Sequence, residues 1–376
     1  MKKILILCVA IIIITPILFF GYRYTNNKNS IIPYPYDISK KLNQNIETDA
    51  PIIIVGDMMA ERLATFTKDL SEKIAGDIEK PIKIESFATS GEGLHRTLDK
   101  IKKLKRLPFV IIYIGNIDNG KEQTFYNKDM KIIVENLEKY YDPLTQSILM
   151  MFPFVSRFIY TPIQYSHLSE KIKPDEQLSS GNDQLFQKRM EVNFKLYEAM
   201  LNEFFNYTIK ANSVVIPVTT PLNLKLKPKK SCYGSFDEST HEDYKLIISL
   251  IKQKDYKGAY NISKELVLIN ASHASTLYLH ALASERLNKY SEAQKHYELA
   301  MAYDCGGIGR GSPIFNAILK NVAKKNGLIY LDFHQYLTDQ SKTNHTFIDD
   351  LYPQDFYLNK LSDMLALRIK KLLKLD

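Results

Sequence analysis

The sequence contains no tryptophan and only three cysteines in 376 residues. Lysine, isoleucine and asparagine are abundant instead, a bias that is typical of an AT-rich bacterial genome and carries no functional information. Hydrophobic residues are not scarce, because they make up 45% of the chain, whereas charged residues make up 24%. The chain can therefore bury a core, and a disordered protein is excluded.

Motifs for nucleic-acid binding are also absent, although the formal net charge is +8 and the pI is near 9.0. The basic residues are spread along expected helix faces, as in 100–106, and do not form a recognition motif. A solvated basic surface near anionic lipid headgroups explains this charge. We therefore expect no nucleic acid, cofactor or metal ion as a partner.

Only one hydrophobic run is long enough to cross a membrane. Residues 4–20 are apolar apart from one threonine and one proline, which is close to the length that spans a hydrocarbon core of about 30 Å. Lys2 and Lys3 precede this run, and positive residues remain on the cytoplasmic side. This pattern predicts a single membrane pass with the N-terminus in the cytoplasm and a periplasmic or extracellular body.

The end of this run predicts that it is not removed. A secretory signal would have a shorter apolar core and a small-x-small cleavage site, which the sequence lacks here. Cys8 lies in the middle of the run, away from the position that lipoprotein processing requires. We therefore expect a transmembrane anchor at 1–23, followed by a polar linker at 24–50.

Short apolar runs alternate with helical patterns along the body. Runs typical of buried parallel strands occur at 51–55, 82–87, 109–114, 213–218 and 328–333. Helical periodicity is found at 59–74, 94–104, 313–325 and 354–375. The alternation predicts an α/β fold with a parallel sheet covered by helices on both faces, and it leaves the strand order open.

The segment between the third and fourth expected strands is predicted to be helical over 121–212. It includes an unusually apolar and aromatic stretch at 148–165. Core packing is the expected role of this stretch, and a lid or a membrane-facing patch are the alternatives.

An internal repeat lies between the fourth and fifth expected strands. Tyr256 and Ala259 recur as Tyr290 and Ala293, a spacing of 34 residues. The second unit resembles a tetratricopeptide repeat in its packing positions, which hold Leu277, Ala281, Ala293, Tyr297 and Ala300. Because two units are too few for a freestanding solenoid, we expect residues 240–304 to be a helical insertion that packs on the α/β domain.

Four polar blocks stand at the ends of these elements. They read Gly56-Asp57-Met58, Thr89-Ser90-Gly91, Gly115-Asn116-Ile117-Asp118 and Asp349-Asp350-Leu351-Tyr352-Pro353. In a parallel sheet such carboxyl ends lie along one edge, where ligand sites form. The order and spacing of the blocks resemble the SGNH (GDSL) hydrolase family, whose blocks are Gly-Asp-Ser, a Gly-bearing loop, Gly-x-Asn-Asp and Asp-x-x-His-Pro. The resemblance implies a flavodoxin-like three-layer domain built from 51–239 and 305–376.

The resemblance also implies serine-hydrolase chemistry, in which a serine attacks an acyl carbonyl, a histidine takes its proton, an aspartate orients that histidine, and N–H groups stabilise the oxyanion. Met58 stands at the serine position and Tyr352 at the histidine position, while Asp349 keeps the aspartate. A thioether is no nucleophile for this reaction, and a phenol with a reference pKa of about 10 is a poor base. Ile117 replaces the oxyanion asparagine, although Asn116 is one residue earlier.

The expected ligand pocket of this degenerate domain is lined by Gly56, Asp57, Met58, Gly91, Asn116, Asp118, Asp349 and Tyr352. A purely structural explanation competes, in which the glycines form tight turns and Asp57 and Asp118 cap helices. A relocated catalytic pair, Ser90 and His95, is another alternative.

These observations predict a membrane-anchored pseudoenzyme that binds an acylated glycan in the old cleft or an envelope protein through the helical insertion. The alternatives are an active esterase or acyltransferase on envelope lipids or polysaccharides with non-standard catalytic residues, and a pure interaction module. Cys232 and Cys305 bracket the insertion, and a helical hairpin returns the chain close to where it left. A disulfide between these two cysteines is therefore expected.

Overall fold

The computed structural model describes residues 47–76, 81–119, 130–161, 183–231, 238–306 and 308–373. The predicted anchor and nearly all of the predicted linker lie outside these residues. Within them, no helix is both long and apolar enough to span a bilayer. The chain divides into two compact units, and residues 130–161 belong to the first, whereas the other described residues belong to the second.

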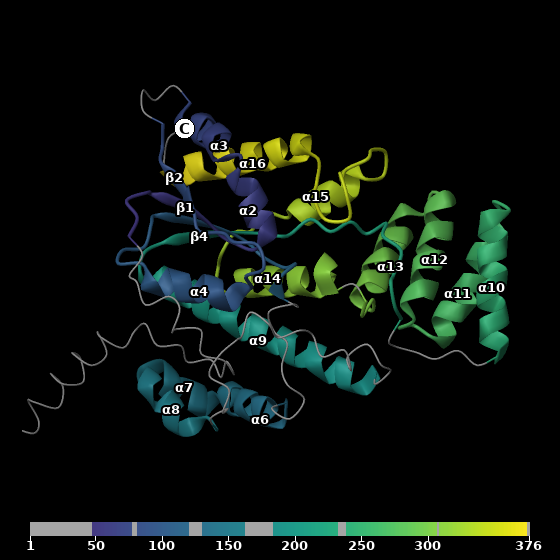
Figure 1. Cartoon of the computed structure of the whole chain (residues 1–376), viewed down its shortest axis with the longest axis horizontal. Helices are drawn as coiled ribbons and strands as arrows, with labels where there is room; N and C mark the ends of the chain where they lie inside the picture. The colour runs from purple at the N-terminus through teal and green to yellow at the C-terminus, as the bar shows by residue number, and fades with distance from the viewer. Residues whose placement is uncertain are drawn as a thin grey trace, which may run out of the picture. The chain divides into compact units, whose positions relative to one another are not determined.

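Four parallel strands form the sheet of the second unit, in the order β2-β1-β3-β4. Their bounds are β1 Ile52–Gly56, β2 Ile84–Ser86, β3 Val110–Ile114 and β4 Val214–Val218. β1 and β3 are buried along their whole length, as expected for strands covered on both faces. The predicted α/β class and four of the five predicted strands are confirmed (Figure 1).

The fifth predicted strand, at 328–333, is wrong. Only Leu331 makes a parallel bridge, with Val218 of β4. Asp332 then accepts the backbone N–H of Gln335 and caps helix α15 (Phe333–Gln340). Because this cap starts a helix, the extended segment ends after one ladder position.

Helices cover both faces of the sheet (Figure 1). The helices packed on one face are α2 (Met58–Ala64), α3 (Thr67–Ala75), α15 and α16 (Asp355–Leu373). Those on the other face are α4 (Leu94–Lys103), α9 (Asp183–Lys210) and α14 (Pro313–Lys325). The segment 59–74, predicted as one helix, forms the two helices α2 and α3. The hydroxyl of Thr65 donates to the carbonyl of Arg62 where α2 ends.

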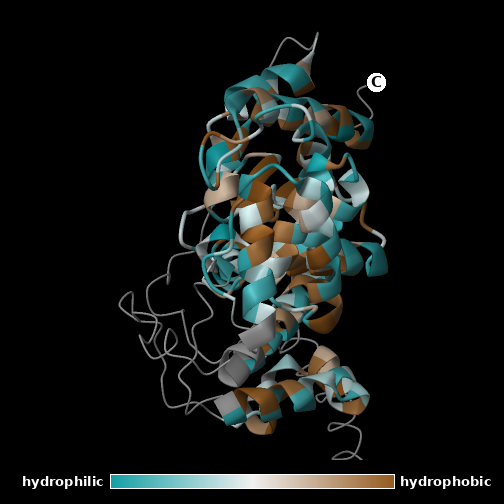
Figure 2. Cartoon of the chain, turned by 90° about the vertical axis from the view of Figure 1, so that its right-hand side faces the viewer, coloured by the Kyte–Doolittle hydropathy of each residue, from teal (hydrophilic) through white to brown (hydrophobic). Residues whose placement is uncertain are grey.

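The insertion consists of two helical hairpins. Their helices are α10 (Glu238–Lys252), α11 (Tyr256–Ile269), α12 (Ala274–Arg286) and α13 (Tyr290–Ala302). Buried alanines such as Ala259, Ala281 and Ala293 allow the helices to approach closely. Hydrophobic and hydrophilic residues are mixed along the helices of the chain (Figure 2). α11 and α13 begin at the 34-residue spacing that the repeat predicted.

The first unit holds α6 (Met130–Tyr141), α7 (Pro143–Met151), a short 3-10 turn (Pro153–Val155) and α8 (Ser156–Ile159). Core packing, the role predicted for 148–165, does not hold for three of its large apolar side chains. Leu149 is buried, but Met150, Met151 and Phe158 are 47%, 51% and 81% exposed. Short helices enclose too little volume to bury every side of an apolar segment.

Candidate functional site

The carboxyl ends of β1 and β3 meet at a turn that only glycine can make. Gly56 has a φ of +134°, and a Cβ on it would lie 1.7 Å from the carbonyl oxygen of Ile114. A side chain is therefore excluded by both conformation and space. This close approach brings the residue after β1 within reach of the loop after β3.

Asp57, the residue after β1, hydrogen-bonds to the loop after β3. Its Oδ2 accepts the backbone N–H groups of Asn116 at 2.8 Å and Ile117 at 2.6 Å, and its Oδ1 accepts that of Met59 at 3.0 Å and caps α2. Burial raises the pKa of Asp57 to about 6, and the charge of Asp118 adds to the rise, while the N–H bonds oppose it. Asp57 therefore caps a helix, as the purely structural explanation of this residue expects.

Asp118 joins the start of α2 to the glycine loop. Its Oδ2 accepts the backbone N–H of Met58 at 3.3 Å and that of Gly91 at 2.8 Å. Asp118 is only 1% exposed. In the SGNH resemblance, these two N–H groups belong to the nucleophile position and the glycine loop, which would stabilise an oxyanion. In this chain both N–H groups already donate to the carboxylate of Asp118.

Asn116 does not line the site. Its side chain is fully buried, and its Oδ1 accepts the N–H of Ser312 at 2.8 Å. Its Nδ2 donates to the carbonyl of Ser312 at 2.9 Å and to Oδ1 of Asn316 at 3.1 Å. The assignment of Asn116 to a ligand pocket is therefore wrong, because its amide is committed to fixing the loop before α14.

Met58 and Tyr352 both pack, partly buried, against the core on the α2 side of the sheet. Burial raises the pKa of Tyr352, and the charges of Asp349, Glu61 and Asp118 raise it further. The phenol therefore stays protonated at neutral pH and is no general base. Asp349 accepts the backbone N–H of Tyr352 at 2.7 Å and so shapes the turn.

The glycine loop carries the alternative nucleophile. Ser90 is exposed, and its backbone N–H donates to the carboxylate of Glu61 at 3.1 Å. Gly91 has a φ of +82°, which favours glycine. His95 lies half-buried in the first turn of α4. Catalysis by Ser90 and His95 stays a hypothesis.

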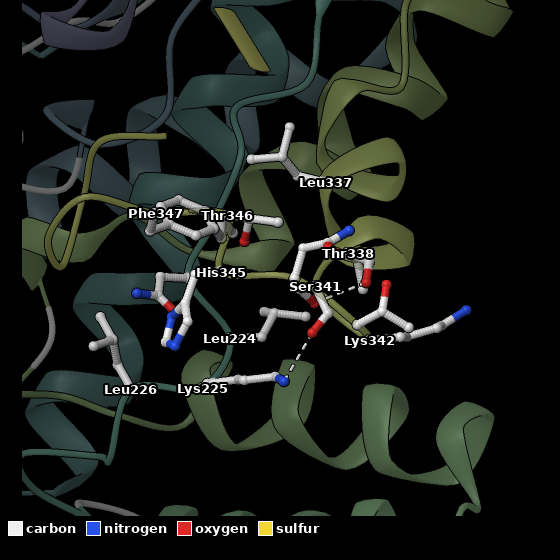
Figure 3. Close-up of a pocket in the computed structure, with 14 residues that line it drawn as sticks. Leu224, Lys225, Leu226, Leu337, Thr338, Ser341, Lys342, His345, Thr346 and Phe347 are labelled. Atoms are coloured by element: carbon white, nitrogen blue, oxygen red, sulfur yellow. Dashed lines mark hydrogen bonds between the residues drawn. The ribbon is translucent and has the colours of Figure 1, made fainter. Parts of the chain in front are cut away.

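A pocket of about 410 Å³ lies elsewhere in the second unit (Figure 3). It is lined by residues 222–226 and by a second set from 337 to 347. Its side chains are mostly hydroxyls, amides and lysines, including Asn223, Thr338, Ser341 and Asn344. No sequence pattern predicted this pocket, because its two walls are more than a hundred residues apart and neither contains a motif.

Cys305 is disulfide-bonded and 8% exposed. Beside it, Ser231 and Asp304 form an antiparallel bridge, and the N–H of Cys305 donates to the carbonyl of Lys230 at 3.2 Å. Cys232 lies outside the described residues, so its pairing with Cys305 stays a prediction. The contacts of its neighbours bring the two ends of the insertion together.

Comparisons of the chain with protein-family models, with curated proteins and with solved structures found no match.

Proposed function

We propose that the chain is a membrane-anchored, extracytoplasmic protein of the bacterial cell envelope, whose SGNH-like domain binds a ligand without hydrolysing acyl groups. The strand order supports the SGNH-like assignment. The order β2-β1-β3-β4, with Leu331 bridging to the outer side of β4, matches the flavodoxin-like order 2-1-3-4-5. In such folds, ligands bind at the carboxyl ends of the strands.

The carboxylate of Asp118 between the N–H groups of Met58 and Gly91 is the observation that carries this proposal. An oxyanion formed there would meet a negative charge in place of two donors. Two like charges about 4 Å apart repel by about 4 kcal/mol at an effective dielectric constant of 20. Loss of one oxyanion donor alone costs about 10²- to 10³-fold in rate. The replacement of serine by Met58 removes the nucleophile as well.

An enzymatic test follows from this arrangement. Wild-type protein should give no turnover of p-nitrophenyl esters or of an acetylated glycan, and no labelling by a fluorophosphonate. Met58→Ser with Tyr352→His should remain inactive, because Asp118 still fills the hole. Adding Asp118→Asn to that pair should give weak turnover. Wild-type turnover that disappears in Ser90→Ala would instead establish an active esterase with a relocated nucleophile.

The pocket lined by 222–226 and 337–347 is the proposed ligand site, in place of the old cleft. Hydroxyl and amide groups in a concave site suit the hydroxyls of a sugar. Saturation-transfer NMR with a partly O-acetylated chitooligosaccharide should show contact with the protein, and Asn344→Ala should weaken it. Ser291→Ala, an exposed change on α13 outside the pocket, is the matched control. Equal binding by both variants would remove the pocket from the proposal.

A protein partner on the insertion is the second candidate, because apolar side chains of α10 and α11 are exposed. Leu246, Leu268 and Ile269 are 45%, 72% and 75% exposed. Exposed large apolar side chains favour an interaction site where they lie together. A photo-crosslinking residue at 269 should capture a specific envelope protein, whereas one at Lys257, on the same helix, should not. Equal capture at both positions would show that the helix makes no specific contact.

A further inference from the structure

A histidine-rich cluster joins α12 to α13 within the insertion and is not used by the proposed function. It consists of His280 on α12 and of Glu292 and His296, one turn apart on α13. One ligand atom of each residue lies within 4.8 Å of the others. His280 is buried, whereas the side chain of Glu292 is 33% exposed. Water and ions can therefore reach the cluster from the Glu292 side.

Both ring nitrogens of His280 have a polar neighbour. The hydroxyl of Ser263 lies 3.1 Å from the carbonyl of Tyr260 and 2.8 Å from Nδ1 of His280. When this hydroxyl donates to the carbonyl, it accepts from Nδ1–H. In that tautomer of the neutral imidazole, Nε2 carries only a lone pair.

This lone pair faces another acceptor. Nε2 of His280 lies 3.2 Å from Oε1 of Glu292. With the imidazole proton on Nδ1 and the carboxylate charged, neither of these two atoms has a proton to share. The phenol oxygen of Tyr260 lies 3.1 Å from Oε1 and 3.2 Å from Oε2 of the same carboxylate, and this hydrogen bond orients the carboxylate.

His296 is oriented in the same way. Its Nδ1 lies 2.8 Å from the backbone carbonyl of Glu292, which can only accept, so Nδ1–H is the donor. Nε2 of His296 is then the nitrogen that offers a lone pair. Histidines that bind metals through one nitrogen commonly donate the other to a carbonyl or hydroxyl, as both of these do.

We propose that His280, Glu292 and His296 bind a zinc ion that ties α12 to α13. Two imidazoles and a carboxylate are typical zinc ligands, and a water molecule would complete a tetrahedron. Zinc bonds of about 2.1 Å place tetrahedral ligand atoms about 3.4 Å apart, so the side chains must close in by small rotations. Lys289 is exposed, and its ammonium lies 3.5 Å from the centre of the Tyr260 ring. Its positive charge repels a bound zinc ion, but solvent screens this repulsion. Three direct ligands outweigh that screened repulsion.

Zinc binding by the full-length, EDTA-treated protein in detergent tests this site. Competition with a chromophoric chelator should give one zinc ion per chain. His296→Gln and Glu292→Gln should each weaken binding by at least tenfold, since each removes a ligand. His241→Gln, an exposed histidine on α10 of the same insertion, is the matched control and should bind zinc as the wild type does. No binding by the wild type, or equal binding by all variants, would overturn the proposal.

A measurement on the wild type alone covers the case in which a variant does not fold. Long-range ¹H–¹⁵N spectra report each imidazole nitrogen separately. Addition of one equivalent of zinc should move the Nε2 signals of His280 and His296 while leaving those of His241 and His345 unchanged. Movement of the exposed histidines instead would show adventitious binding and refute the site.

Discussion

Replacement of Asn116 tests whether its amide has a structural role. The family resemblance would instead place a catalytic asparagine at the next position, which is Ile117 in this chain. Asn116→Ala removes three buried hydrogen bonds, to the N–H and carbonyl of Ser312 and to Asn316. Each neutral bond contributes about 1 kcal/mol, and the buried N–H of Ser312 left without a partner costs about 1–3 kcal/mol more. We therefore expect a loss of about 4–6 kcal/mol in the free energy of unfolding.

Urea unfolding measures this loss, and circular dichroism should follow it, since the chain has no tryptophan to report by fluorescence. Asn223→Ala is the matched control, because its amide makes one exposed bond of 3.3 Å, to the carbonyl of Asp349. It should cost less than about 1 kcal/mol. Asn116→Asp should destabilise at least as much as Asn116→Ala at pH 7, because a carboxylate would face the carbonyl of Ser312.

Wild-type stability in Asn116→Ala, combined with altered ligand binding or ester turnover, would refute the structural role of this amide. It would return Asn116 to the ligand pocket. Loss of stability in Asn223→Ala equal to that in Asn116→Ala would show that the buried position of the amide does not matter.

Four further outcomes are expected. Protease added to spheroplasts should digest residues 30–376, and full protection would reverse the predicted topology. Non-reduced peptide mass spectrometry should find Cys232 linked to Cys305, a bond that contributes about 4 kcal/mol in the chain-entropy model, and two free thiols would disprove it. Gly56→Ala should cost more than about 4 kcal/mol or prevent folding, since its Cβ would overlap a backbone oxygen of β3, and a stable variant would contradict that geometry. The free energy of unfolding should fall by about 3 kcal/mol as the pH rises from about 4 to 6. In this range the folded state keeps a proton on Asp57 that the unfolded state releases. Asp57→Asn should remove this pH dependence.

The exposed apolar residues of the first unit bear on the alternatives for 148–165. Met150, Met151 and Phe158 have the exposure that a membrane-facing patch or a lid requires, and core packing does not account for them. Fluorescent labelling of cysteine replacements at these positions, with and without vesicles of anionic lipid, would distinguish a membrane contact from a lid over protein. A blue shift only with vesicles would indicate the membrane.

The sequence by itself determined the parts of this protein that depend on local pattern. Continuous apolar runs gave β1, β3 and β4, because a strand buried on both faces has no polar positions. The 34-residue repeat located the helical hairpins, since small and aromatic residues recur wherever two helices pack. The position of Gly56 after an apolar run predicted a turn, and its positive φ confirms this turn. Each of these properties belongs to residues that are close together in the chain.

Only the tertiary structure decided how distant groups meet. Leu331 was predicted to lie within a strand, but the capping side chain of Asp332 ends that strand after one bridge. Asn116 looked like a ligand-facing amide, but its side chain bonds to Ser312 before α14 and to Asn316 within α14, about 200 residues later in the chain. The same holds for Asp118, whose carboxylate takes N–H groups from two separate loops. Hydrogen bonding and charge act over a few ångströms in space, and a sequence pattern does not record which loops the fold brings within that distance.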